Sequence, residues 1–205
     1  MEVLQRQKES IDASDVLTRL ELERGAYIVL SAHREENIDS EKNFQDLVDA
    51  INLMAQVYNK RIIISTHPRT RKKLEEKEFE FGKLADFIKP LGFADYIKLQ
   101  SNAFCVVSDS GTITEESSLL RFPAITIRQA HERPEGMDEG TLIMSGLDPQ
   151  DIVSAIEIVT RQFVHNPKGP NIVPDYDSEC VSQKVVRIIM SYTKYIRRTV
   201  WREDV

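Results

Sequence analysis

Cysteine is scarce in this sequence. Only Cys105 and Cys180 occur among the 205 residues, which is too few for a disulfide framework, and their spacing matches no zinc motif. Cys105 lies inside an apolar run and Cys180 lies near a predicted helix start. Because free cysteine is among the most buried residue types, we expect both thiols to be buried and structural.

Long apolar runs and excess positive charge are also lacking. No window approaches the roughly 18 to 20 uninterrupted apolar residues of a membrane span, and residues 1–15 are too polar for a signal peptide. We therefore expect a cytoplasmic protein with no membrane partner. The formal net charge is −6, whereas a surface that binds duplex nucleic acid needs surplus positive charge. We expect no nucleic-acid partner, so any anion site must be local.

The sequence does contain a regular alternation of short apolar runs and longer helical patterns from residue 26 onward. This alternation is typical of βαβ units and predicts an α/β fold with a buried parallel sheet. Strands are expected at residues 27–31, 61–65, 87–89, 104–108, 124–127 and 142–144. Helices are expected between them, most clearly at residues 43–58 and 151–163, where apolar residues recur at three- and four-residue spacing.

Both ends of the chain carry amphipathic patterns outside this alternation. Residues 1–20 are a helix candidate, and residues 181–201 are another, which ends in a basic and aromatic run. A basic amphipathic tail can bind a membrane surface. Here charge interrupts the apolar side, so packing on a second domain or subunit is the simpler interpretation.

Histidines and arginines gather where predicted strands end, which is where ligands of open α/β sheets bind. Three histidines have an arginine within two residues: His33 with Arg34, His67 with Arg69, and His131 with Arg133. Each histidine alone could make an ordinary hydrogen bond, or together they could bind zinc with Asp109. Guanidinium groups repel a cation and favour phosphate or carboxylate. We therefore expect an anion site and no metal.

The clearest anion site is the polar turn after the fourth predicted strand. Residues 108–116 read SDSGTITEE, and the turn opens directly into a predicted helix. Unsatisfied N–H groups and the macrodipole make a helix N-terminus attractive to anions. Gly111 permits close approach of a ligand, and Ser110 and Thr112 can add hydroxyl donors. A diphosphate fits this pattern.

Simple helix capping is the alternative interpretation of this turn. Thr112-x-x-Glu115 matches a capping box, in which both side chains bond to backbone N–H groups. Glu116 lies on a different helix face and has no role in that box. A carboxylate one turn inside a phosphate-binding helix is suited to accept both hydroxyls of a ribose.

Three segments in combination resemble the C-terminal domain of the non-hydrolysing UDP-N-acetylglucosamine 2-epimerases. They are AHREEN at 32–37, the SDSG turn at 108–111 with its paired glutamates, and ERPEG at 132–136. Their order and spacing agree with that family throughout residues 26–160. The resemblance implies a Rossmann-like sheet flanked by helices, as one half of a GT-B-type two-domain enzyme.

By that resemblance, the chain divides into three parts. Residues 1–25 are expected to be a helix and linker from a first domain absent here, and residues 26–175 the UDP-sugar-binding domain. Residues 176–205 are expected to form a C-terminal helix that packs on the other domain or subunit. The intact enzyme is expected to be a homodimer.

The resemblance also implies a reaction. A UDP-linked N-acetyl sugar would be inverted at C2 by elimination of UDP to a 2-acetamido glycal and re-addition of UDP, to supply precursors of bacterial surface polysaccharides such as capsules. No cofactor is implied. The family's acid and base carboxylates at C2 come mainly from the first domain, so this chain alone is expected to bind UDP without turnover.

Carried over by position, the resemblance assigns two sets of residues. Catalytic roles fall to His33, Arg34 and Glu35. Contacts to UDP or the sugar fall to His67, Arg69, Phe93, Ser108, Asp109, Ser110, Gly111, Thr112, Glu116, Arg128, Glu132 and Arg133. Breaking the C1–O bond places charge on the diphosphate, which fixed cationic and N–H donors stabilise in the transition state.

Three departures from the common epimerases concern the substrate. Thr112 replaces a second glycine, residues 65–69 read STHPR, and His131 precedes the ERPEG segment. All three resemble the capsule and O-antigen branch that forms UDP-N-acetyl-L-fucosamine. Two alternatives of other kinds remain: the donor-binding half of a GT-B glycosyltransferase, and a non-catalytic nucleotide-sugar-binding module.

Overall fold

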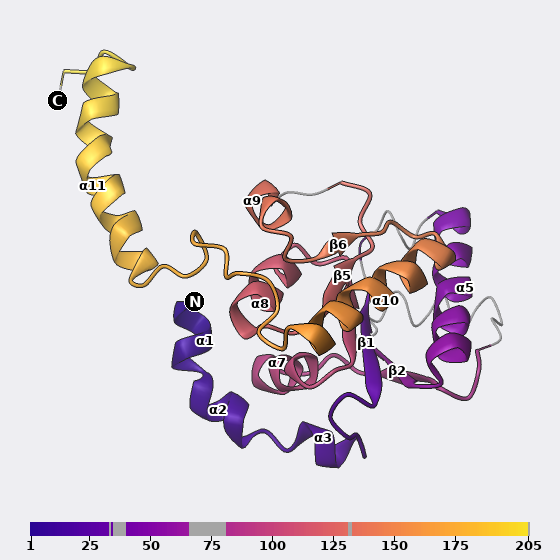
Figure 1. Ribbon diagram of the computed structural model, residues 1–205. Helices are drawn as coiled ribbons and strands as arrows, with labels where there is room; N and C mark the ends of the chain where they lie inside the picture. Colours follow the sequence, from indigo (N-terminus) through magenta and orange to yellow (C-terminus); the bar gives the residue numbers. More distant parts are fainter. Residues whose placement is uncertain (33, 35–39, 66–80, 131–132, 205) are drawn as a thin grey trace.

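The computed structural model describes residues 1–32, 34, 40–65, 81–130 and 133–204 (Figure 1). One six-stranded sheet runs in the order β3-β2-β1-β4-β5-β6, and all neighbouring strands are parallel. The strands are β1 (Tyr27–Ser31), β2 (Arg61–Ser65), β3 (Ala85–Ile88), β4 (Cys105–Ser108), β5 (Ala124–Thr126) and β6 (Ile143–Met144). The predicted α/β fold with a parallel sheet is confirmed, and this strand order is that of a Rossmann-like sheet.

Helices cover both faces of the sheet. On one face lie α5 (Glu41–Tyr58) and α10 (Pro149–His165), and on the other lie α3 (Val16–Arg19), α7 (Phe93–Ser101) and α8 (Ile113–Leu120). The remaining described helices are α1 (Glu2–Arg6), α2 (Lys8–Ala13), α9 (Pro134–Asp138) and α11 (Val181–Thr199).

Alternation along the strands explains why the sheet is buried on both faces. In β1, Ile28 and Leu30 contribute to the core under α5 and α10, whereas Tyr27 and Val29 contribute to the core under α7 and α8. Successive side chains of a strand point to opposite faces. Continuous apolar runs are therefore needed here, and these runs are the pattern from which the strands were predicted.

The two most clearly predicted helices are confirmed as α5 and α10, and polar residues mark their ends. The Ser40 hydroxyl accepts a hydrogen bond from the Asn43 N–H at the start of α5, which ends at Asn59 in the left-handed region (φ 47°). The Asp148 carboxylate caps α10, and Pro149 is the first residue of that helix. Polar caps and a proline in the first turn are common at helix starts.

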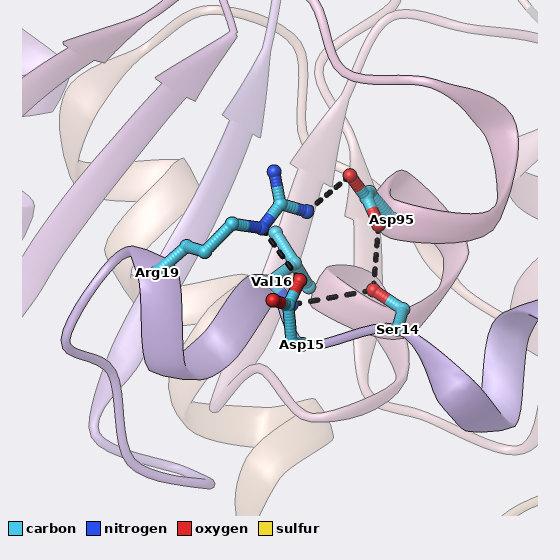
Figure 2. Close-up of polar contacts among 5 residues, drawn as sticks. All are labelled: Ser14, Asp15, Val16, Arg19 and Asp95. Atoms are coloured by element: carbon cyan, nitrogen blue, oxygen red, sulfur yellow. Dashed lines mark hydrogen bonds and ion pairs between the residues drawn. The ribbon is translucent and has the colours of Figure 1, made fainter.

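The expectation of one helix over residues 1–20 is wrong. Three short helices occur instead: Gln7 (φ −97°, ψ 3°) separates α1 from α2, and Ser14, which is extended (φ −62°, ψ 129°), breaks the helical path before α3. Figure 2 shows what holds this break: the Ser14 hydroxyl donates to Asp95 Oδ1 (2.6 Å), and Arg19 pairs with Asp15 and Asp95. Val16 is fully buried in the core. Contacts with α7, far along the chain, therefore override the local amphipathic pattern.

The two cysteines differ. Cys105 is buried in the sheet as expected, and burial raises the pKa of its thiol. Cys180 is exposed, so the expectation that it is buried is wrong. It lies at the start of α11, and no residue of this helix is buried, so there is no core into which Cys180 could pack.

The predicted C-terminal helix is confirmed as α11. It extends away from the body of the molecule (Figure 1), and none of its residues is buried. Several large apolar side chains of this helix are exposed, among them Val185, Ile188, Ile189, Tyr192 and Tyr195. Across the described part of the chain, no helix has the length and apolar character needed to cross a membrane.

Candidate functional site

The candidate site lies at the carboxyl ends of β1, β4 and β5. The chain order reverses between β1 and β4, and the last residues of these two strands, Ser31 and Ser108, are direct neighbours in the sheet. Loops that leave adjacent parallel strands in opposite directions open a crevice at this point. The segment with Arg34 follows β1, the turn 109–112 follows β4, and Arg128 follows β5.

Asp109 joins two of these loops. It is fully buried, and its Oδ2 accepts a hydrogen bond from the Arg34 N–H (2.8 Å), while Arg34 Nε donates to the Asp109 carbonyl oxygen (3.0 Å). The Asp109 N–H donates to the Ser31 carbonyl oxygen (3.1 Å). Arg34 is therefore held through both its backbone and its side chain, and its guanidinium lies at the edge of the sheet.

The turn that opens α8 is shaped by its own hydroxyl groups. The Ser110 N–H donates to Ser108 Oγ (3.1 Å), and the Ser110 and Thr112 hydroxyls lie within hydrogen-bond distance (3.0 Å). The helix begins with residue 113, directly behind this turn. The predicted strand–turn–helix is thus confirmed, with two hydroxyl groups at the helix N-terminus, where unsatisfied N–H groups attract anions.

The predicted capping box is wrong. Within the described residues, the Thr112 side chain makes no capping hydrogen bond, and its backbone is already helical (φ −70°, ψ −14°) rather than extended as capping residues usually are. Glu115 binds outside its own helix, because its Oε1 accepts a hydrogen bond from Arg133 Nε at 2.5 Å. Arg133, 18 residues further along the chain, has replaced the backbone N–H of residue 112 as the partner of Glu115.

Two guanidinium groups lie against Gly111. A Cβ atom placed on this glycine would be 3.2 Å from Arg133 Nη1 and 3.7 Å from Arg128 Nη1. Both arginines line a small pocket together with Ser110, Gly111, Thr114, Thr126 and Met137. Arginine binds phosphate and carboxylate in a bidentate manner, so two of them beside a helix N-terminus form a concentrated anion site.

Glu116 lies one turn into the helix, half-buried, in a polar environment that sequence reasoning missed. Burial raises the pKa of its carboxyl group, although hydrogen bonds from Thr112 and Gln100 oppose this effect. Gln100 also forms a hydrogen bond with Tyr96, which in turn bonds to Ser31. Burial raises the pKa of Tyr96 to about 12. Tyr96 and Gln100 are four residues apart and share one face of α7. That spacing was visible in the sequence, but nothing in it pointed towards α8.

Other predicted residues stand apart from this cluster. Phe93 begins α7, is 44% exposed, and lines a surface hollow with residues of α1 and α2. Five predicted site residues lie outside the described residues: His33, Glu35, His67, Arg69 and Glu132. The structure thus brings together Arg34 with Asp109, and the 110–116 segment with Arg128 and Arg133.

This chain is similar in sequence and in structure to members of one enzyme family. A sequence model of the UDP-N-acetylglucosamine 2-epimerase family matches residues 1–190. The UDP-N-acetylglucosamine 2-epimerase of Methanocaldococcus jannaschii is 33% identical over 173 residues, which are 82% of this chain and 45% of that protein.

Solved structures agree with the sequence comparison. The UDP-N-acetylglucosamine 2-epimerase from Rickettsia bellii is 45% identical and matches 98% of this chain and 54% of its own, with a TM-score of 0.89. The Methanocaldococcus jannaschii enzyme in complex with UDP-GlcNAc and UDP is 27% identical and matches 91% of this chain and 51% of its own, with a TM-score of 0.78. The chain spans about half the length of these relatives.

Proposed function

This chain belongs to the UDP-N-acetylglucosamine 2-epimerase family, and we propose that it is the UDP-binding half of a UDP-N-acetyl-hexosamine 2-epimerase with a GT-B-type fold. One observation carries the proposal: the start of α8, two arginines and a half-buried glutamate converge at the switch point of the sheet. A relative of the same fold has been solved in complex with UDP-GlcNAc and UDP. A nucleoside diphosphate matches the chemistry of this cluster, because hydrogen-bond donors for an anion lie at one end and a carboxylate lies one helical turn away.

The diphosphate is assigned to the turn at Gly111. The Ser110 hydroxyl and the N–H groups at the start of the helix, including that of Thr112, would donate to phosphate oxygens, while the Thr112 hydroxyl donates to Glu116. Arg128 and Arg133 lie close enough to Gly111 that an anion resting on the turn would meet both guanidinium groups. A side chain at residue 111 would occupy part of this space.

The ribose is assigned to Glu116. Its carboxylate can accept from both ribose hydroxyls, and the partners Thr112 and Gln100 keep it in place. Burial disfavours the charged form in the free chain, so hydrogen bonds from a ribose would compensate for lost solvation. Phe93, whose ring is exposed at the start of α7, remains a candidate contact to the nucleotide.

Catalysis by the whole enzyme would use His33, Arg34 and Glu35 beside the leaving diphosphate. The two hydrogen bonds between Arg34 and Asp109 support this role, because a preorganised cation stabilises developing negative charge without reorganisation. His67, Arg69 and Glu132 keep their predicted roles as contacts to UDP or the sugar. With C2 acid and base carboxylates expected from another domain, the chain alone would bind UDP without turnover.

The wider assignments are proposals of the same kind. Residues 1–25 would link to the other domain, residues 26–175 would bind the nucleotide sugar, and the apolar side of α11 within residues 176–205 would pack on that domain or on a second subunit of a homodimer. The substrate would belong to the UDP-N-acetyl-L-fucosamine branch, in a cytoplasmic pathway to capsular polysaccharide. A complete enzyme that epimerised UDP-N-acetylglucosamine and ignored the UDP-N-acetyl-6-deoxy-talose-type sugar, the precursor of UDP-N-acetyl-L-fucosamine, would overturn the substrate assignment.

Calorimetry with UDP tests the central proposal. The wild-type chain should bind one UDP and keep the same affinity in the presence of a chelator. Glu116→Ala and Ser110→Ala should each weaken binding, for Glu116→Ala by roughly 10- to 100-fold, the effect of losing hydrogen bonds to a charged group. Glu157→Ala, an exposed glutamate of α10, is the matched control and should bind like wild type.

The ribose assignment has its own readout. Wild type should prefer UDP over 2′-deoxy-UDP, and Glu116→Ala should lose this preference, because the carboxylate would no longer accept from the 2′ hydroxyl. Absence of UDP binding by the folded wild-type chain at millimolar concentration would contradict the proposed site.

A further inference from the structure

The segment between α10 and α11 contacts both α8 and α9. Its Val173 is buried, and the Val173 N–H donates to Ser118 Oγ of α8 (2.9 Å), a hydrogen bond that is itself buried. The Tyr176 N–H then donates to the Val173 carbonyl oxygen (3.0 Å) and closes a turn. Tyr176 is therefore held at a defined place beside α8, although it is 63 positions from the start of that helix.

Tyr176 contacts the start of α9 in two ways. Its hydroxyl donates to Glu135 Oε1 at 2.9 Å. A Cβ atom on Gly136 would lie 3.1 Å from this hydroxyl oxygen and would overlap Thr114 Cγ2 of α8 on the other side. The first turn of α9 is thus enclosed between α8 and Tyr176, with room for glycine alone.

Arg133 depends on the same turn for its position. It is the residue directly before α9, and its carbonyl oxygen accepts a hydrogen bond from the Gly136 N–H (3.2 Å). Its side chain reaches back across α8, where Glu115 accepts from Nε and Nη1 comes to rest over Gly111. A shift of α9 would therefore move this guanidinium away from the turn.

We propose that Tyr176 is a positioning residue for the diphosphate site: its hydrogen bond to Glu135 holds the first turn of α9 in place and thereby keeps Arg133 over Gly111. This inference rests on the proposed function, which supplies the diphosphate that Arg133 would contact. Tyr176 itself would touch no part of the nucleotide.

The charges around Tyr176 support a stable donor. Burial, followed by the hydrogen bond to Glu135 and the charges of Glu135 and Glu115, raises the pKa of its phenol, against a smaller opposing effect of Arg133. The pKa of Glu135 is lowered by its own backbone N–H and by Tyr176. At neutral pH the pair is therefore a protonated phenol and a carboxylate, the combination that gives the stronger, charge-assisted hydrogen bond.

Calorimetry on four variants with UDP and UMP tests the inference. Tyr176→Phe keeps the ring and removes the donor, and it should weaken UDP about 3- to 10-fold, as expected for one lost hydrogen bond, while UMP changes less than about 2-fold. Tyr58→Phe is the matched control, because it removes a hydroxyl that donates to the Val153 carbonyl oxygen (2.8 Å) elsewhere. It should leave both affinities unchanged.

The arginine itself provides the decisive comparison. In an Arg133→Ala background, Tyr176→Phe should have no further effect on UDP, because the residue through which it acts is gone. Equal weakening of UDP and UMP, no weakening of UDP, or an undiminished effect in the Arg133→Ala background would each overturn the inference while the proposed function stands. Failure of wild type to bind UDP would overturn both. If Tyr176→Phe does not fold, Glu135→Ala removes the same contact from the other side and should reproduce the selective loss of UDP.

Discussion

Replacing Gly136 by alanine should destabilise the protein through one specific overlap. The new Cβ would lie inside contact distance of Thr114 Cγ2, with Tyr176 Oη at 3.1 Å and Thr114 Cβ at 3.6 Å. Thr114 is buried on α8, so its methyl group cannot turn away into solvent. Overpacking of this kind costs about 1–3 kcal/mol. For a domain of this size, 1 kcal/mol corresponds to about 2–4 °C in Tm, so we expect a fall of roughly 2–12 °C.

A second substitution should reverse this loss. Thr114→Ser removes the overlapping methyl group, so the double variant with Gly136→Ala should be more stable than the two single effects predict, by a coupling energy of about 1 kcal/mol or more. Thermal and urea unfolding of the four proteins in the cycle measures this coupling. Gly82→Ala is the control, because nothing lies within 4 Å of a Cβ there. An unchanged Tm for Gly136→Ala, or additive single effects, would refute the packing argument.

Three further predictions concern charge and exposure. Burial raises the pKa of Glu116 above its ordinary value of 4.5. The folded chain therefore holds a proton on Glu116 at pH values where the unfolded chain has lost it, and stability falls as pH rises from the unfolded pKa through the folded pKa. Glu116→Gln should therefore raise the Tm of the free chain at pH 7 but not at pH 4, as differential scanning calorimetry would show. Ser14 and Arg19 hold the pKa of Asp95 below its usual value, so their stabilisation is present at pH 7 and lost as pH falls below that pKa. Asp95→Asn should lower stability by about 0.5–1 kcal/mol at pH 7, and its difference from wild type should shrink as pH falls below 3.8. A difference in urea unfolding that does not change with pH would contradict this. A thiol reagent should label Cys180 in the native chain and a second thiol only after denaturation; two rapid equivalents on the native chain would contradict the burial of the other thiol.

Local sequence patterns were sufficient to predict the strands, the turn at 108–112 and the main helices, because residues close along the chain decide these structures. β1 and β2 have the predicted bounds. β4, β5 and β6 differ from prediction by one residue at one end, and β3 starts two residues and ends one residue earlier than predicted. The agreement arises because strands buried on both faces require continuous apolar runs. The turn at 108–112 and the helix behind it followed from small polar residues between a strand and an amphipathic pattern. The three- and four-residue spacing of α5 and α10 indicated their buried faces.

Only the tertiary structure decided which distant partners these segments meet. Glu115 has the spacing of a capping residue, but it pairs with Arg133, because α9 brings a guanidinium close enough to form a charged hydrogen bond. The N-terminal pattern predicted one helix, but Ser14 bonds to Asp95 of α7 and the helical path breaks there. Tyr176 gave no local sign of a role. Hydrophobic periodicity encodes which face of an element is buried, whereas the pairing of polar groups depends on where the folded chain places elements that are far apart in sequence.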